Sequence, residues 1–198
     1  MVWGKAGSTT LSSTGDTITV SGMTASNFNQ FMSHNLQSGN VAQATRLDND
    51  SGTNYAYRRS VNGAADVTSG SFSRMVTSPT SGTHDEFSVQ YIINISSEEK
   101  LNITESMAGN TAGAGNAPSR AESVNKWANT STQFTRIDNV NIGTGDYNTD
   151  SNLTALGSDI TPVAAVPGIE NVQDNSLFVE KDTAKRYWFS SGTWSEDA

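Results

Sequence analysis

The chain has 198 residues and a mass of 21.0 kDa, with 34% hydrophobic and 16% charged residues and a formal net charge of -8. This length can hold one well-buried core with an appendage, or two small units, and we expect one main domain. The many hydroxyl and amide side chains favour an all-β domain. The acidic balance argues against a nucleic-acid partner, because binding phosphate backbones needs clustered Lys and Arg. The absence of cysteine excludes disulfides and thiolate metal sites.

The first part of the chain predicts short strands. Residues 16–20 place Ile18 and Val20 on one face, between two turn signals. Residues 28–36 and 41–47 predict two further strands around a Gln-Ser-Gly-Asn segment.

Residues 55–61 and 64–68 predict a β-hairpin. Asn62-Gly63 lies between them and supplies the two positive φ angles that a type I′ turn requires. The odd-numbered residues of the first strand, from Tyr55 to Val61, are expected to share one face.

Residues 86–95 form the clearest predicted strand. Its apolar face at period two consists of Phe87, Val89, Tyr91, Ile93 and Ile95. We expect this face to lie at the centre of the core. Leu101 and Ile103 predict an antiparallel partner strand, and a short helix beginning at Ser96 is the alternative.

The second part of the chain continues the β pattern. A loop is expected at residues 108–119, and further strands around 121–128, 133–139 and 153–157. Without a convincing helix, residues 1–158 predict an antiparallel β-sandwich. The four prolines fall outside the predicted strands, as a sheet requires.

The C-terminal part predicts an extended arm. Residues 159–176 are expected to be a linker, and residues 177–198 a small β-meander. Such a meander has almost no interior, so its aromatic side chains should bury against another surface. The expected assembly residues are Trp3, Phe178, Tyr187, Trp188, Phe189 and Trp194.

Several segments together resemble a group of virion proteins from tailed phages and environmental viruses. The segments are GDTITVSG, NYAYRRSVNGAAD, EFSVQYIINISSEEKL, NTAGAGNAPSR and VNKWANTSTQFTRID. The C-terminal FVEKDTAKRYWFSSGTW separately resembles the ending of many phage fibre and structural proteins. The first of these two resemblances, to the virion proteins, covers roughly residues 1 to 158 and implies a concanavalin A-like or jelly-roll sandwich.

The resemblance implies a non-enzymatic structural protein on the virion surface, either a capsid decoration protein or a head or tail fibre subunit. The implied partners are other copies of the chain and a major capsid or tail protein. Because the N-terminal segment lacks the basic flank and apolar run of a signal peptide, we expect synthesis in the host cytoplasm. No segment predicts membrane insertion.

Calcium is the one cofactor that the sequence raises. Asp48, Asn49 and Asp50 place carboxylate and amide oxygens on a turning loop, which suits a hard cation. The alternative is an Asx-rich turn, because Arg59 stands where an EF-hand requires Glu. Our expectation is that the protein has no cofactor.

Two other functions remain as alternatives. A receptor-recognising, lectin-like module at a fibre tip would bind a host-surface glycan through Tyr55, Tyr57 and Trp127. A polysaccharide depolymerase would need two carboxylates across a groove, and the strand motif of such enzymes is absent. We therefore expect no enzymatic activity.

Overall fold

The computed structural model describes residues 3–79, 82–109, 112–158, 176–179, 183–190 and 193–196. The chain divides into two compact units, Met1–Ile160 (unit 1) and Thr161–Ala198 (unit 2), which are described separately. Every regular element among the described residues is a β-strand, and all strands pair antiparallel. The predicted all-β, antiparallel class is confirmed.

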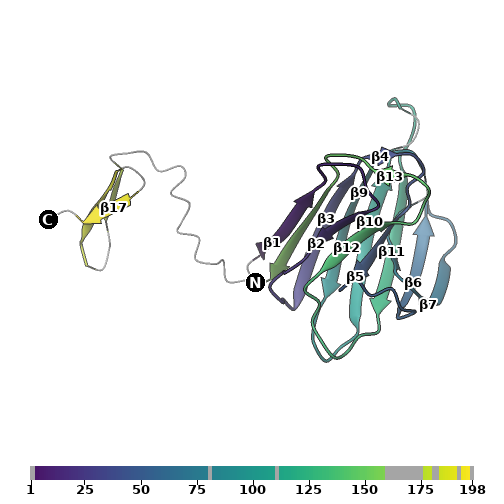
Figure 1. Ribbon diagram of the computed structural model, residues 1–198, viewed down its shortest axis with the longest axis horizontal. Helices are drawn as coiled ribbons and strands as arrows, with labels where there is room; N and C mark the ends of the chain where they lie inside the picture. The colour runs from purple at the N-terminus through teal and green to yellow at the C-terminus, as the bar shows by residue number, and fades with distance from the viewer. Residues whose placement is uncertain are drawn as a thin grey trace. The chain divides into compact units, whose positions relative to one another are not determined.

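Unit 1 contains three sheets (Figure 1). In spatial order, the eight-stranded sheet consists of β1 (Trp3–Thr10), β14 (Asn152–Ser158), β3 (Phe28–Asn35), β9 (Glu86–Ile93), β10 (Lys100–Ala108), β11 (Ser119–Trp127), β6 (Tyr55–Val61) and β7 (Val67–Phe72). The four-stranded sheet consists of β2 (Thr17–Val20), β12 (Ile137–Asn141), β5 (Gln43–Leu47) and β8 (Met75–Val76). The third sheet pairs β13 (Asp146–Tyr147) with β4 (Gln37–Ser38).

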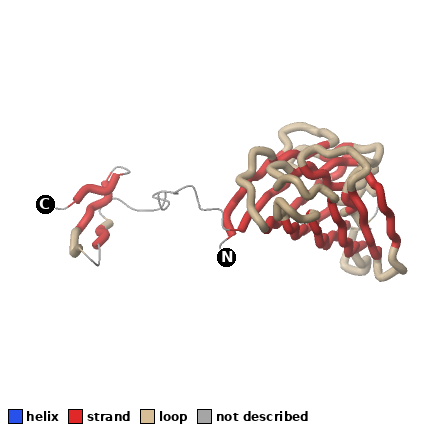
Figure 2. The backbone as a smooth tube through the Cα atoms, turned by 90° about the horizontal axis from the view of Figure 1, so that it is seen from below, coloured by secondary structure: helices blue, strands red, loops and turns tan. Residues whose placement is uncertain are grey.

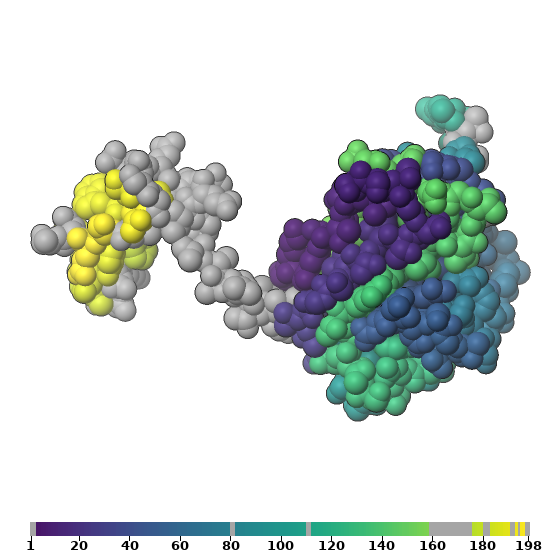
Figure 3. All heavy atoms as spheres, in the orientation of Figure 1, coloured from purple at the N-terminus to yellow at the C-terminus, as the bar shows by residue number. Residues whose placement is uncertain are grey.

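The two larger sheets lie in two layers around one core (Figure 2). Ile18 and Ile137 enter this core from the four-stranded sheet, and Phe31, Ile92 and Leu153 enter it from the eight-stranded sheet. Figure 3 shows the side of unit 1 on which purple, blue and green segments cover the eight-stranded sheet. We call the covered face of this sheet the inner face and the opposite face the outer face.

The predicted strand at residues 16–20 and the predicted hairpin are both present. Ile18 and Val20 of β2 are buried, as their alternation predicted. Asn62 and Gly63 have φ angles of 52° and 77° and join β6 to β7. The second hairpin strand begins at Val67 rather than at residue 64. Val67 pairs with Arg59, and the residues between Val61 and Val67 form the turn.

The strands predicted at residues 28–36 and 41–47 form, but they belong to different sheets. β3 joins the eight-stranded sheet and β5 joins the four-stranded sheet, so the chain changes layer between them. At this crossing Gly39 has a φ of 124°, and a side chain there would lie 3.2 Å from the Gly145 Cα. The turn therefore requires glycine on steric grounds.

The predicted orientation of residues 86–95 is wrong. Phe87 and Tyr91 are exposed on the outer face, whereas Glu86, Ser88 and Gln90 are buried on the inner face. Period two identifies two faces of a strand but not which of them is covered. The apolar side of β9 faces away from the core.

Hydrogen bonds between the two layers make a polar inner face possible. The Ser88 Oγ lies 2.7 Å from the Ser33 Oγ and accepts a bond from Gln43 Nε2 at 3.1 Å. Gln90 Nε2 donates to Thr45 Oγ1 at 3.0 Å. Since buried polar groups are tolerated when they are bonded to one another, these pairs fix the position of β5 over β9.

Unit 2 is a three-stranded antiparallel meander of β15 (Leu177–Val179), β16 (Arg186–Ser190) and β17 (Thr193–Glu196). The three predicted strands are thus present. Leu177 lies opposite Trp188, and both are exposed. Except for Ser176, the predicted linker at residues 159–176 lies outside the described residues.

The side chain of Lys100 connects two loops at one end of the eight-stranded sheet. Its side chain is buried, and Nζ donates to the carbonyl oxygens of Ile95, Glu98 and Asn129 at 2.7–2.9 Å. Burial lowers the pKa of Lys100, and the charge of Glu98 opposes this effect. One ammonium group therefore joins the β9–β10 turn to the segment after β11.

Replacing Lys100 by Met should lower the free energy of unfolding by about 3 kcal/mol, because three carbonyl groups lose a charged donor. Thermal unfolding followed by circular dichroism measures this loss. Lys185→Met is the matched control, since the ion pair of exposed Lys185 with Glu196 is screened by water. Equal melting temperatures for the two variants would contradict the role of Lys100.

Candidate interaction surface on the eight-stranded sheet

Apolar side chains form rows across the outer face of the eight-stranded sheet. Tyr91 of β9 lies opposite Ile103 of β10, and Ile103 lies opposite Val124 of β11. In the neighbouring row Phe28 of β3 lies opposite Ile93 of β9. Because opposite side chains on one face stand about 5 Å apart, these rows form a continuous surface.

The apolar side chains of this surface are about half exposed. Ile103 is 57% exposed, Leu101 50% and Tyr91 48%. The exposed large apolar residues of this face are Trp3, Phe28, Phe87, Tyr91, Leu101, Ile103, Met107 and Val124. Among the other described residues, the large exposed ones are Leu177, Phe178, Val179 and Trp188 of unit 2, with Val67 and Ile142 elsewhere. Contiguous exposure of this kind marks an interaction site.

The outer face is hollowed into an open groove of about 620 Å³. Its lining is mainly apolar and includes Phe28, Tyr91, Leu101, Ile103 and Val124. Arg58 and Lys126 also line the groove, on the side of β6 and β11. The groove therefore combines an apolar floor with two cations at one side.

Charged side chains surround the apolar rows. Arg58 forms an ion pair with Asp66 at 3.0 Å, and Lys126 forms one with Glu99 at 2.9 Å. Glu122 lies on the same strand as Val124, two residues before it, and its side chain points to the same face of the sheet. An apolar centre with a charged margin is the usual composition of a protein–protein interface.

A second set of inner hydrogen bonds holds the strands beneath this surface. Asn125 Nδ2 donates to Asn102 Oδ1 at 2.9 Å, and Thr104 Oγ1 donates to the same oxygen at 2.6 Å. The Val76 backbone N–H of β8 donates to Asn125 Oδ1 at 3.1 Å. The inner amides thus fix the strands whose outward side chains form the apolar rows.

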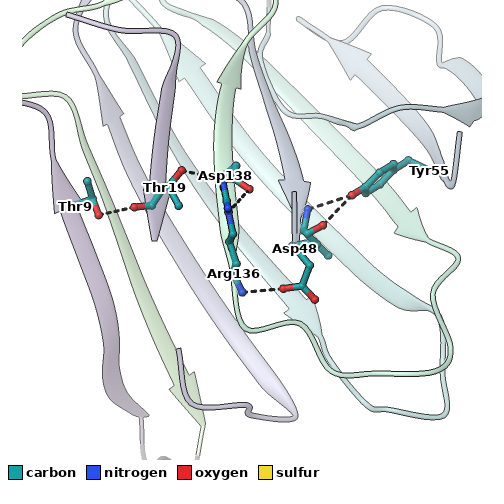
Figure 4. Close-up of polar contacts among 7 residues, drawn as sticks. Thr9, Thr19, Asp48, Tyr55, Arg136 and Asp138 are labelled. Carbon is teal, nitrogen blue, oxygen red and sulfur yellow. Dashed lines mark hydrogen bonds and ion pairs between the residues drawn. The ribbon is translucent and has the colours of Figure 1, made fainter. Parts of the chain in front are cut away.

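Two of the three predicted calcium ligands, Asp48 and Asp50, accept hydrogen bonds from other residues of the chain. Asp48 Oδ1 accepts a bond from the backbone N–H of Arg136 at 3.0 Å (Figure 4). It accepts a second bond from the backbone N–H of Thr135, also at 3.0 Å. Asp48 and Asn49 adopt positive φ angles of 48° and 57°, as in a turn. Among the described residues, no three His, Asp or Glu side chains are grouped so that they can hold a metal ion.

Asp50 fastens its loop to the aromatic residues that we proposed for glycan binding. Its Oδ2 accepts bonds from Trp127 Nε1 at 2.6 Å and from Asn54 Nδ2 at 2.9 Å. Burial acts to raise the pKa of Asp50, but the bonds from Asn54, Trp127 and Gly52 outweigh it and lower the pKa. The loop is thus an Asx-type turn, and the Asp50 carboxylate holds it against Trp127 through a hydrogen bond.

Tyr55 and Trp127, two of the three residues predicted to bind a glycan, are buried side by side in the core. They are 1% and 3% exposed and stack on each other at 6.2 Å between ring centroids. The Tyr55 hydroxyl contacts the Leu47 backbone, and burial raises the pKa of this hydroxyl. Tyr57 is half-buried and packs edge-on against Phe72. Neither stacked ring offers the exposed face that a sugar requires.

A polar chain on the four-stranded sheet serves the packing of the layers (Figure 4). Arg136 donates to both oxygens of buried Asp138 at 2.8–3.0 Å, and this contact raises the pKa of Arg136. Thr19 Oγ1 donates to Asp138 Oδ1 at 2.6 Å, and Thr9 Oγ1 donates to the Thr19 carbonyl at 2.6 Å. β1, β2 and β12 are joined in this way.

The side chains of the predicted assembly residues differ in their exposure to solvent. Trp3, Phe178 and Trp188 are 42%, 52% and 43% exposed and can contact another molecule. Tyr187 is half-buried and packs against Phe178 at 6.0 Å between ring centroids. Phe189 is only 4% exposed, so its expected role as a contact is corrected. The side chain of Trp194 lies outside the described structure.

Sequence reasoning missed the outer face as a surface. Phe87, Tyr91, Leu101 and Ile103 were recognised as an apolar alternation but assigned to the core. The opposite alternation of Ser, Gln, Asn and Thr on β9, β10 and β11 was the available signal. Three adjacent strands with polar residues at matching positions indicate a bonded polar layer.

Comparison with protein-family models, with curated proteins and with solved structures gives no match. In the described part of the chain, no helix is long and apolar enough to cross a membrane.

Glu86 is the most perturbed acid of unit 1 and lies at the end of β9. It is fully buried, Oε2 accepts a bond from Ser78 Oγ at 3.0 Å, and Oε1 has no hydrogen-bond partner among the described residues. Burial raises the pKa of Glu86 to about 8, and the Ser78 bond opposes the rise. The folded chain therefore keeps this proton where an exposed carboxyl, with a pKa of 4.5, loses it.

Because the folded state binds the extra proton between about pH 4.5 and 8, the free energy of unfolding should fall as pH rises through this range. Glu86→Gln removes this dependence. As the pH rises, the free energy of unfolding of the variant relative to that of the parent should therefore increase by up to roughly 1.4 kcal/mol per pH unit. Urea unfolding from pH 5 to pH 8 measures the difference. Glu98→Gln, in an exposed turn, is the control. Parallel profiles for the parent and Glu86→Gln would contradict the assignment.

Proposed function

We propose that the chain is a non-enzymatic structural subunit on the surface of a virus particle, as a capsid decoration protein or a head or tail fibre subunit. One observation carries the proposal: the large exposed apolar side chains gather on the outer face and on unit 2. Two such surfaces on one chain suit a protein that contacts several neighbours. The resemblance of its segments to virion proteins is the reason for placing these contacts on a virus particle.

In this proposal, unit 1 is a jelly-roll or concanavalin A-like sandwich, and unit 2 with its linker is an attachment arm. Leu177 and Trp188 lie opposite each other across β15 and β16 and are 47% and 43% exposed. They form an apolar pair of the kind that fills a pocket on a partner. The partner of the arm is a major capsid or tail protein. Many copies on a symmetric particle turn a modest affinity into stable attachment.

Immunogold electron microscopy of particles from the virus that encodes this chain should label the particle surface. Purified chain should also sediment with particles that lack it. Leu177→Ser with Trp188→Ser should reduce the sedimented fraction at least about tenfold, because the apolar contact is lost.

Ile142→Ser, which changes an exposed residue of unit 1 outside the outer face, is the control and should bind normally. Unlabelled particles would contradict the virion-surface role. Equal sedimentation of the double variant and the parent would contradict attachment through unit 2.

A further inference from the structure

We propose that the outer face of the eight-stranded sheet packs against the same face of a second copy of this chain. The inference rests on the proposed function and names one of the contacts that a particle subunit would make. It is carried by the continuity of the apolar rows, by their area and by the register of the charges beside them.

The apolar area of the outer face matches the need of a dimer. Eight large side chains are each 36–57% exposed, from Phe28 to Ile103. At about half of roughly 150–250 Å² each, they offer on the order of 700 Å² per copy, against about 800 Å² per partner in a stable interface. A face of this size is covered by a whole sheet rather than by a short peptide.

The geometry of the face suits sheet-on-sheet packing. Its apolar residues lie on adjacent strands in regular register, from Phe28 on β3 to Val124 on β11. Two such sheets pack about 10 Å apart and interdigitate their side chains. The groove of about 620 Å³ provides room for the side chains of the opposite sheet.

The charges of the outer face are arranged for a two-fold contact. The row of Tyr91, Ile103 and Val124 is flanked on one side by Lys126 and on the other by Glu122, both on β11. A two-fold axis along this row, perpendicular to the strands, exchanges the two sides. Lys126 of each copy then faces Glu122 of the other, which gives two ion pairs between the copies.

Along β9 and along the row of Tyr91, Ile103 and Val124, the same operation places apolar side chains on apolar side chains. Residues of the axial row meet their own counterparts, so Ile103 faces the second Ile103. Ile93 and Val89, which flank Tyr91 on β9, exchange places and face each other. Leu101 faces Glu105 of the second copy, and Arg58, which lies opposite Val124 at the end of the axial row, faces its own counterpart while it keeps its ion pair with Asp66. The self-complementary part of the face is therefore the apolar centre with its two Lys126–Glu122 pairs, as an isologous interface requires.

Light scattering after size-exclusion chromatography of the full chain should give twice the monomer mass. Ile103→Asp should weaken the dimer at least about 100-fold, because it places two carboxylates on the axis. Ile142→Asp introduces the same change at an exposed isoleucine outside the face and should remain dimeric. Circular dichroism verifies that both variants are folded.

Cross-linking provides a second readout that does not depend on dissociation. The chain has no cysteine, so Ile103→Cys introduces a single thiol near the axis. Since packed sheets stand about 10 Å apart, a short bismaleimide should join two such copies. Ile142→Cys should yield no cross-linked dimer.

Three results would overturn the inference. They are a monomeric parent at every concentration, an Ile103→Asp variant that stays dimeric, and equal cross-linking at positions 103 and 142. A dimer that is lost only with Leu177→Ser and Trp188→Ser would place the contact in unit 2. These results are separate from the particle experiments, because a monomer that labels particles keeps the proposed function, and a dimer that does not label them refutes it.

Discussion

The hydrogen-bonded polar layer between the two sheets is the constraint on which the rest of unit 1 depends. Ser88, Gln90 and Asn125 point inward from the eight-stranded sheet and must find partners there, since an unpaired buried amide costs about 1–3 kcal/mol. Gln43 and Thr45 of β5 and the backbone of β8 supply those partners. The bonds are directional, so they fix the relative position of the sheets more narrowly than apolar contact would.

The polar inner layer determines what the outer face becomes. Successive side chains of a strand point to opposite faces, so inward Ser88 and Gln90 leave Phe87, Val89 and Tyr91 outward. β10 repeats the arrangement with Asn102 and Thr104 inward and Leu101 and Ile103 outward. The exposed apolar surface is thus not a local irregularity of one strand. It follows from a register that three neighbouring strands share, and it is as fixed as the core itself.

The sequence was sufficient to predict most of the longer strands and insufficient to predict which face of the central strand β9 is covered. The period-two alternation located β2, β9, β10 and the three strands of unit 2, and the Asn62-Gly63 turn located the β6–β7 hairpin. Choosing the covered face requires knowing which strands lie in the opposite layer, which is long-range information. The same limit applied to Trp127, which is buried and donates its indole N–H to the carboxylate of Asp50, a residue distant in the sequence. β1 was missed because Gly, Ser and Thr residues give it no apolar alternation.

An acidic chain can associate through this face because its negative charges lie elsewhere. The net charge is -8, yet the outward positions of β3, β9, β10 and β11 carry only two acids, Glu105 and Glu122, with Arg120 and Lys126 beside them. The Debye length at physiological ionic strength is about 8 Å, so acids beyond the margin of the face repel weakly across a contact. Those remote acids still oppose unspecific association of other surfaces. In the proposed dimer, the charge distribution therefore favours contact through the outer face of the eight-stranded sheet, where two cations accompany the two acids.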